Sequence, residues 1–321
     1  ACVCSDEGIA VSTYNIIKCT VNGDCGGGGA ITIQTNEGVN HIVNVEGCEF
    51  NNIPATSHRI FLAPNKGLFY DFTLNTDLEA TTAYEFNVFV KLGLQNIRLA
   101  DGVYNAEYFY LNGKNINISA VNPGNVTINS FVHLNGGKYT FNGIKFTNTN
   151  AYKSNPEAAG EEIKAYHYTS CVGIANQETE VRFEKCTFEI VNTDYAIWAH
   201  CGTKSTFNEC YFDCNEHRPI ATNGPKTVVN NCTFKDQYHY SLRLFENNHL
   251  SQEVAFTNNK ITGTNSKGEF EGINISKKDG SANITGKFVI KGNTDGLKYR
   301  HHEKVTMDAS CVYDTDIENF A

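Results

Sequence analysis

The residues best suited to chemistry recur at a regular spacing in the second half of the chain. Asp194, His217 and His239 are 23 and 22 positions apart, and Trp198 and Arg243 follow the same steps with Ala221 between them. Carboxylates, imidazoles, guanidiniums and phenols can bind an acidic or hydroxyl-rich ligand or move its protons. The candidate ligand-binding residues are Asp194, Tyr195, Trp198, His200, His217, Arg218, His239, Tyr240 and Arg243.

One chemistry open to this set is a lyase reaction on a uronic-acid polymer. Such a lyase needs a cation to neutralise the sugar carboxylate and a base of suitable pKa at C5. The candidate catalytic residues are therefore Arg218 or Arg243 as the cation and His239 or Tyr240 as the base. A glycosidase would instead need two carboxylates on this face, and Asp194 has no certain partner there.

The other chemistry is binding without catalysis. Trp198, Tyr195 and Tyr240 offer flat faces against which sugar rings stack, while arginine and histidine side chains contact carboxylates and hydroxyls. An alternative is that these are ordinary solvent-facing residues without a function. They would then be aligned only because every position of a solenoid is stacked on the equivalent position of the next repeat. Because no complete catalytic set is present, the pattern favours binding over an enzyme.

The elements that must position these residues form a repeat over residues 171–276. A branched aliphatic residue recurs at steps of 23, 23, 22 and 31 positions, each preceded by a small or compact residue. This period, with period-two alternation and little helical patterning, predicts a solenoid of short strands, a parallel β-helix. Residues one or three positions from the aliphatic column should face solvent. The aliphatic column is Ile174, Ile197, Ile220, Leu242 and Ile273.

A second column contains cysteine followed two residues later by phenylalanine. Cys186, Cys210 and Cys232 occupy the same strand position in successive repeats, so they should point inward as small hydrophobic side chains. We expect free thiols in a chain made in a reducing compartment, although twelve cysteines would suit disulfides in a secreted chain. Zinc binding by Cys2, Cys4, Cys19 and Cys25 is an alternative, but no Cys-x-x-Cys pair occurs, and we predict neither metal nor cofactor.

The first 80 residues do not follow this register. We interpret residues 1–80 as a small N-terminal β region, which serves as an attachment domain or cap, and residues 81–321 as the β-helix with a C-terminal cap or tail. The runs His58–Leu62 and Gly67–Leu74 favour a hairpin across Pro64-Asn65-Lys66-Gly67. Residues 83–92 predict a short amphipathic helix that caps the first coil.

A distinctive series of strands follows the predicted helix. It runs Asn96-Ile-Arg-Leu-Ala-Asp-Gly-Val-Tyr104, then Tyr108 to Ser119, then Val126-Thr-Ile-Asn129. This series resembles the opening of right-handed, single-stranded β-helix proteins of the pectin-lyase-like superfamily, and the resemblance covers about residues 83–300. It implies the fold but says little about function, because the superfamily includes lyases, hydrolases, esterases, phage tailspikes and fibres, and adhesins.

Within that superfamily the chain looks most like a phage or viral fibre, spike or decoration protein that presents a glycan- or receptor-contacting face. The resemblance implies a homotrimer, attachment to other particle proteins through residues 1–80, and synthesis in the cytoplasm followed by association with the virion. The alternative is an exported uronate polysaccharide lyase or a bacterial surface adhesin, secreted or held at the cell surface.

Charge and hydropathy exclude two classes of partner. The net charge is −9, and no basic patch is evident that would neutralise nucleic-acid phosphates. No apolar run approaches the roughly 20 residues of a membrane-spanning helix. We therefore expect neither a nucleic-acid partner nor a membrane span.

Overall fold

The structure is a computed structural model, and apart from one short helix the regular secondary structure of the residues that it describes is β-strand. The chain divides into two compact units, residues 1–102 and residues 103–321, which we treat separately. The functional boundary expected after residue 80 stays a prediction. The described residues are 2–4, 11–26, 28–34, 41–54, 56–63, 72–149, 170–174, 178–200, 202–238, 240–244, 251–263, 271–275, 284–294, 298–302, 305–307, 311–313 and 317–320.

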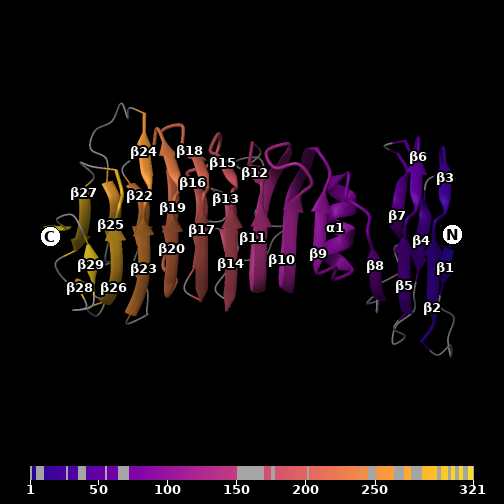
Figure 1. The fold of residues 1–321 in the computed structure, drawn as a ribbon, viewed down its shortest axis with the longest axis horizontal. Helices are drawn as coiled ribbons and strands as arrows, with labels where there is room; N and C mark the ends of the chain where they lie inside the picture. The colour runs from indigo at the N-terminus through magenta and orange to yellow at the C-terminus, as the bar shows by residue number, and fades with distance from the viewer. Residues whose placement is uncertain are drawn as a thin grey trace. The chain divides into compact units, whose positions relative to one another are not determined.

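Unit 1 contains three parallel sheets that stack coil upon coil (Figure 1). β7 pairs with β4 and β8 pairs with β5, both in parallel, so the predicted hairpin is wrong. The run His58–Leu62 and the described end of the second run, residues 72–74, lie in different sheets because each strand adds to a preceding coil; residues 64–71 lie outside the described residues. The sheets are β1 (Cys2–Cys4), β4 (Gly29–Gln34) and β7 (His58–Leu62); β2 (Thr13–Ile17), β5 (His41–Glu46) and β8 (Phe72–Thr76); and β3 (Thr20–Asn22) with β6 (Glu49–Asn51).

The predicted helix is present as α1 (Ala83–Lys91) and is followed by β9 (Asn96–Leu99). Thr82 is its N-cap, and the Thr82 hydroxyl accepts a hydrogen bond from the backbone N–H of Glu85 at 3.1 Å. Phe86 and Phe89 are buried on one side of the helix. No helix among the described residues is both long and apolar enough to cross a membrane.

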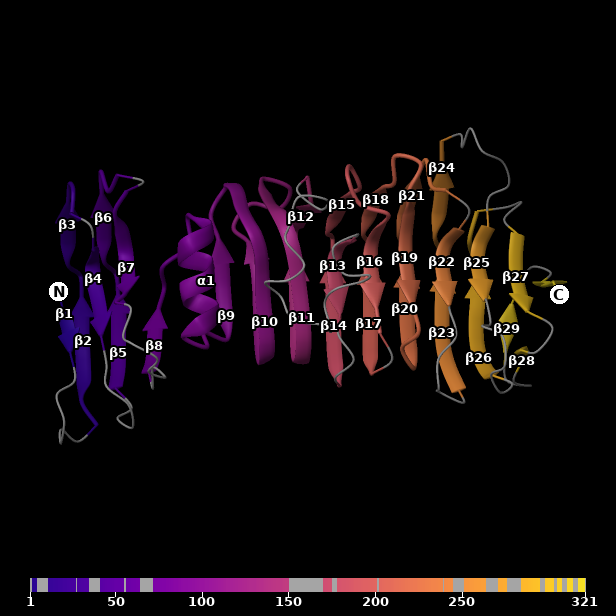
Figure 2. The same ribbon diagram turned by 180° about the vertical axis from the view of Figure 1, so that it is seen from behind.

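Unit 2 is a parallel β-helix with three strands in each regular coil (Figures 1 and 2). It opens with β10 (Gly102–Ala120), β11 (Val126–Asn142) and β12 (Ile144–Thr147). The first sheet continues from β11 through β13 (Ser170–Ile174), β16 (Tyr195–Ala199), β19 (Arg218–Thr222), β22 (Tyr240–Leu244), β25 (Glu271–Ile275), β27 (Lys298–His302) and β30 (Ile317–Phe320). The second continues from β11 through β14 (Thr179–Glu184), β17 (Thr203–Asn208), β20 (Lys226–Asn230), β23 (Ser251–Thr257) and β26 (Ile284–Lys291), then β28 (Val305–Met307) and β29 (Val312–Tyr313). The third is β12, β15 (Thr187–Glu189), β18 (Tyr211–Asp213), β21 (Thr233–Lys235) and β24 (Lys260–Thr262).

The aliphatic column is confirmed in four of its five coils. Ile197, Ile220, Leu242 and Ile273 are aligned, but the residue aligned with Ile197 on β13 is Val172, not Ile174. A shift by two residues keeps every side chain on its face, so the hydrophobic pattern cannot distinguish the two registers.

Phenylalanine rings fill the interior between the second and third sheets. Phe183 stacks on Phe207 with ring centroids 5.2 Å apart, and Phe188 stacks on Phe212 at 4.8 Å. All four side chains are fully buried. Offset stacking at these distances adds to the hydrophobic contribution of the buried area.

The bend between these two sheets carries the cysteine column. Each cysteine follows a residue in the left-handed region, such as Glu209 with φ 53° before Cys210. Cys186, Cys210 and Cys232 are buried, and their thiols are free and donate to backbone carbonyls of the preceding coil, as Cys210 Sγ does to Phe183 O at 3.4 Å. In the next coil Asn259 takes the same place, and its Nδ2 donates to Val229 O at 3.0 Å. The inward orientation predicted for the three cysteines is confirmed.

Candidate functional site

The candidate residues lie on the first sheet, where β16, β19 and β22 belong to consecutive coils. The register aligns Trp198 with Ala221 and Ala221 with Arg243, which confirms the predicted column. Tyr195 is aligned with Arg218. Neighbouring strands are about 4.8 Å apart, so residues from three coils act together on this face.

Two arginines lie against tyrosine rings on this face. The Arg218 guanidinium carbon is 5.6 Å from the Tyr195 ring centroid and 5.4 Å from that of Tyr238. The Arg243 guanidinium carbon is 5.9 Å from the Tyr240 ring centroid. These are cation–π distances. We call Tyr195, Arg218, Tyr238, Tyr240 and Arg243 the Arg–Tyr site.

Arg218 is half-buried and makes no ion pair with any carboxylate that the structure describes. An arginine held by aromatic rings keeps its five N–H donors in a fixed plane, and that plane matches a carboxylate in a bidentate fashion. A cation in such a setting can attract an anionic ligand group.

The aromatic faces of the site are buried, contrary to the expectation that they face solvent. Tyr195, Trp198 and Tyr240 are 7%, 9% and 5% exposed. Trp198 packs edge-on against Tyr195 at a centroid distance of 4.8 Å, beside the small side chain of Ala221. Both faces of β16 are therefore covered, and flat stacking of a sugar ring on Trp198 is disfavoured.

The ionisation of the site does not favour a base. Burial, and then the neighbouring Tyr195 hydroxyl, raises the pKa of Tyr240 well above its ordinary value, despite the two nearby arginines. A raised pKa keeps the Tyr240 hydroxyl protonated at neutral pH, which disfavours Tyr240 as the base of a lyase. Burial lowers the pKa of His200, so this half-buried imidazole is neutral as well.

Sequence reasoning missed a histidine at the start of the same column. His133 on β11 is aligned with Gly173 of β13, which is aligned with Trp198. Burial, and then the nearby His200, lowers the pKa of His133 to about 4. The exposed Tyr110 stacks on His133 with centroids 4.8 Å apart. The signal available in the sequence was the Val132-His-Leu134 alternation, which precedes the repeats used for the alignment.

The remaining candidates lie at the margin of the Arg–Tyr site. Asp194 and His217 are partly exposed and precede the aligned pair Tyr195 and Arg218 on adjacent coils. The Arg218 backbone N–H donates to the Asp194 carbonyl at 3.0 Å. His239 lies outside the described residues. No group of three or more His, Cys, Asp or Glu side chains that the structure describes is placed to hold a metal ion.

The fold and this face together define a parallel β-helix protein with arginines and aromatic residues on one sheet. The chain belongs to the family described as right handed beta helix region, whose model matches residues 130–312. A search of curated proteins finds no match.

Two solved structures are similar to the chain. Pectin methylesterase PemA from Erwinia chrysanthemi is 12% identical, with 66% of this chain and 71% of that chain covered and a TM-score of 0.43. A pectin methylesterase in complex with hexasaccharide VII is also 12% identical over the same shares, with a TM-score of 0.38. Similarities this low carry no argument about activity.

Proposed function

We propose that the protein binds an acidic glycan through the Arg–Tyr site. The observation that carries this proposal is the half-buried guanidinium of Arg218, which lies near the rings of Tyr195 and Tyr238 without a described carboxylate partner. A partly buried setting strengthens charge-assisted hydrogen bonds, and a pre-positioned arginine loses little entropy on binding. Because the aromatic faces are buried, recognition rests on ligand carboxylates more than on ring stacking.

Calorimetric titration with uronate oligosaccharides tests the proposal, with neutral oligosaccharides of equal length as the comparison. Arg218→Gln should weaken uronate binding by about 10- to 100-fold, the loss expected for a hydrogen-bonded charge pair. The matched control is Arg182→Gln on β14, because Arg182 is more exposed and already paired with Glu184; it should change the affinity by less than about twofold. Equal losses in both variants, or equal binding of the neutral sugars, would contradict the proposal.

The second candidate function is a uronate polysaccharide lyase. Uronate polymers also distinguish this activity from binding without catalysis, because only a lyase converts them to an unsaturated product. Under the binding proposal, uronate polymers yield no rise in absorbance at the unsaturated-product band, and the affinity is flat from about pH 6 to 8 because arginine does not titrate there. A rise that Arg243→Ala or His239→Ala abolishes would favour the lyase instead.

We further propose that this glycan-binding chain is a fibre, spike or decoration component of a virion and forms a homotrimer, with residues 1–80 facing other particle proteins. The superfamily resemblance supports this, and the alternatives are a secreted enzyme and a surface adhesin. Light scattering coupled to size-exclusion chromatography should give three times the chain mass of 35.5 kDa. A monomer across the working concentration range would count against a fibre.

A further inference from the structure

Unit 1 contains the cysteine-bearing bend that also forms the buried column of unit 2. Cys19 and Cys48 each follow a residue in the left-handed region, Lys18 with φ 52° and Gly47 with φ 58°. Each thiol donates to the backbone carbonyl two residues before it, at 3.5 Å and 3.6 Å respectively. Cys210 makes the same contact in unit 2 at 3.5 Å. One local structure therefore recurs in both units.

The strand register places the two cysteines of unit 1 on adjacent coils. Thr20 of β3 is aligned with Glu49 of β6, so the residues just before them, Cys19 and Cys48, are equivalent. The Glu49 backbone N–H donates to the Cys19 carbonyl at 2.8 Å, which holds the two backbones together at this point. Neighbouring strands lie about 4.8 Å apart, within the roughly 4.4–6.8 Å that separates the Cα atoms of a disulfide.

The bend also directs successive thiols to the same side. Cys48 Sγ donates to Ile16 O of the preceding coil at 3.2 Å, just as Cys210 Sγ donates to Phe183 O. In the equivalent buried pair of unit 2, the thiols of Cys186 and Cys210 are within hydrogen-bonding reach of each other. The same bend brings the two thiols of unit 1 together.

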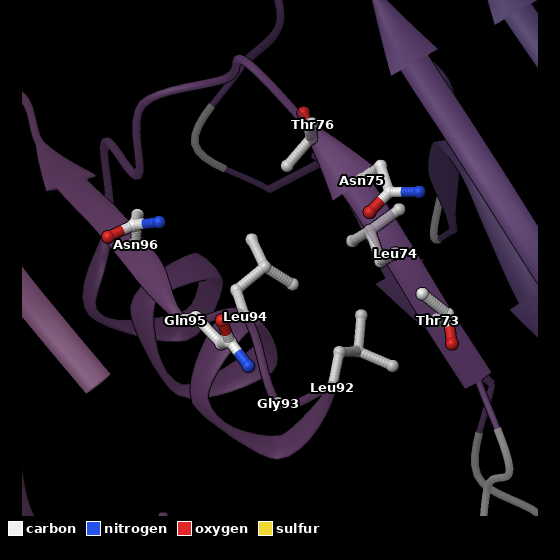
Figure 3. A pocket seen from close by; sticks show the side chains of 9 residues that line it. All are labelled: Thr73, Leu74, Asn75, Thr76, Leu92, Gly93, Leu94, Gln95 and Asn96. Carbon is white, nitrogen blue, oxygen red and sulfur yellow. The ribbon is translucent and has the colours of Figure 1, made fainter. Parts of the chain in front are cut away.

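This column of unit 1 has two cysteines. Val45 of β5 is aligned with Thr76, the last residue of β8, which Figure 3 shows in the lining of a cavity. Three residues further along each strand, Cys48 corresponds to Glu79, so the next coil supplies no thiol at this position. The partner of Cys48 within the column is therefore Cys19.

Solvent access separates this pair from the column of unit 2. Cys19 is exposed and Cys48 is partly exposed, whereas Cys186, Cys210 and Cys232 are at most 2% exposed. A thiolate must reach the sulfur that it attacks, so exposure and thiolate content together control the rate of thiol–disulfide exchange. Burial also raises the pKa of the Cys186 thiol, which keeps that sulfur protonated.

We propose that Cys19 and Cys48 form a site of thiol–disulfide exchange with low-molecular-weight disulfides such as glutathione disulfide. The Cys19 thiolate attacks one sulfur of the small disulfide, forms a mixed disulfide and releases one thiol. The Cys48 thiolate then attacks the Cys19 sulfur, forms the Cys19–Cys48 bond and expels the second thiol. The two protons of the protein thiols end on the two released thiols, so the chain loses two electrons and the small disulfide gains them.

The new bond would hold the first two coils of unit 1 together. Among the described residues β3 pairs only with β6, and a crosslink at this point removes conformational freedom from the opened state. The first coil is therefore held more firmly in an oxidising medium than in a reducing one. This dithiol belongs to unit 1, and its chemistry does not depend on the Arg–Tyr site.

The test is to incubate the fully reduced chain with glutathione disulfide and to follow it by intact mass and by peptide mapping without reduction. We expect a transient adduct of one glutathionyl group on Cys19, followed by the loss of two hydrogen atoms and a Cys19–Cys48 crosslink. Hydrogen exchange at residues 13–22 and 41–51 should then slow by about tenfold or more. Dithiothreitol should reverse the change.

Three variants assign the roles. Cys48→Ser should stop the reaction at the glutathionyl adduct of Cys19 and leave hydrogen exchange unchanged. Cys19→Ser should slow adduct formation by about tenfold or more, because Cys48 is the less exposed thiol. Cys25→Ser is the matched control, since Cys25 is a partly exposed thiol in the same unit, and it should give the same crosslink at the same rate. Hydrogen exchange of the reduced variants checks that each is folded.

Three results would overturn the proposal. A glutathionyl adduct that persists on the unaltered chain would show that the two sulfurs do not meet. A crosslink from Cys19 or Cys48 to another cysteine would assign the exchange to a different pair. Reaction of Cys19 no faster than that of the buried Cys210, including no reaction before the chain unfolds, would show that exposure does not select this site.

Discussion

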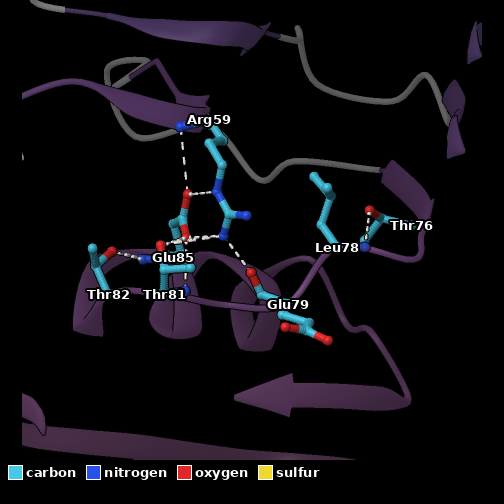
Figure 4. A network of polar contacts seen from close by, with 7 residues as sticks. All are labelled: Arg59, Thr76, Leu78, Glu79, Thr81, Thr82 and Glu85. Atoms are coloured by element: carbon cyan, nitrogen blue, oxygen red, sulfur yellow. Dashed lines mark hydrogen bonds and ion pairs between the residues drawn. The ribbon is translucent and has the colours of Figure 1, made fainter. Parts of the chain in front are cut away.

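Replacing Arg59 with alanine is expected to lower the free energy of unfolding of unit 1 by about 3–5 kcal/mol, the usual cost of removing one partner of a buried ion pair. Glu85 is 3% exposed, and Arg59 Nε donates to its Oε1 at 2.8 Å (Figure 4). The Thr81 backbone N–H also donates to the Glu85 carboxylate, at 2.9 Å. Without Arg59 the carboxylate stays buried at α1 with its charge uncompensated.

The measurement is thermal and denaturant unfolding, with hydrogen exchange of α1 and β7 as a local readout, because solenoids do not always unfold in one step. The matched control is Arg98→Ala, since Arg98 and Glu79 form an ion pair at 2.9 Å with side chains 56% and 33% exposed. That variant should cost at most about 1 kcal/mol. Similar losses in the two variants would refute a special role for the buried pair.

The pH dependence follows from the same contacts. Burial alone would raise the pKa of Glu85, but hydrogen bonds and charge from Arg59, together with Thr81, outweigh it and hold the pKa below the ordinary 4.5. A lowered folded-state pKa contributes stability above pH 4.5 that is lost as the pH falls through the folded value. In the Arg59→Ala variant, the free energy of unfolding should no longer fall in this way as the pH is lowered. Adding Glu85→Gln to that variant should recover part of the stability, because the amide carries no charge that needs a partner.

Much of the β-helix could be predicted because its coils repeat side chains of one type. Ile197, Ile220 and Leu242 mark one inward column, and Cys186, Cys210 and Cys232 mark another. The coils of unit 1 could not be recognised in the sequence. The asparagines at equivalent positions of β2, β5 and β8, which are Asn15, Asn44 and Asn75, are 29 and 31 residues apart instead of 22 or 23. A period is evident only when several successive steps agree.

The sequence predicted which residues of the site are aligned on successive coils, but not how far their side chains are exposed to solvent. The register of Trp198, Ala221 and Arg243 follows from strand spacing alone. The burial of Trp198 depends on what covers the outer face of β16, which alternation does not encode. The contact of Arg218 with Tyr238 also escaped prediction, because Tyr238 precedes β22 and lies outside the aligned pattern.

Phe207→Ala is expected to lower the free energy of unfolding of unit 2 by about 3–5 kcal/mol, the usual loss for a buried phenylalanine. Phe207 is fully buried and stacks on Phe183 at 5.2 Å, with Phe212 edge-on at 6.0 Å. The truncation leaves a cavity beside β17. The neighbouring strands cannot move in to fill it without breaking the backbone hydrogen bonds that join successive coils.

The control for this prediction is Tyr211→Ala on β18, in the same coil, because Tyr211 is 36% exposed. A surface change of this kind should stay within about 0.5 kcal/mol. Denaturant unfolding measures both variants, and equal midpoints would show that the phenylalanine column is not the source of stability. Since each coil contacts only its neighbours, a defect at β17 should also speed hydrogen exchange in β14 and β20 before it reaches the other strands of the second sheet.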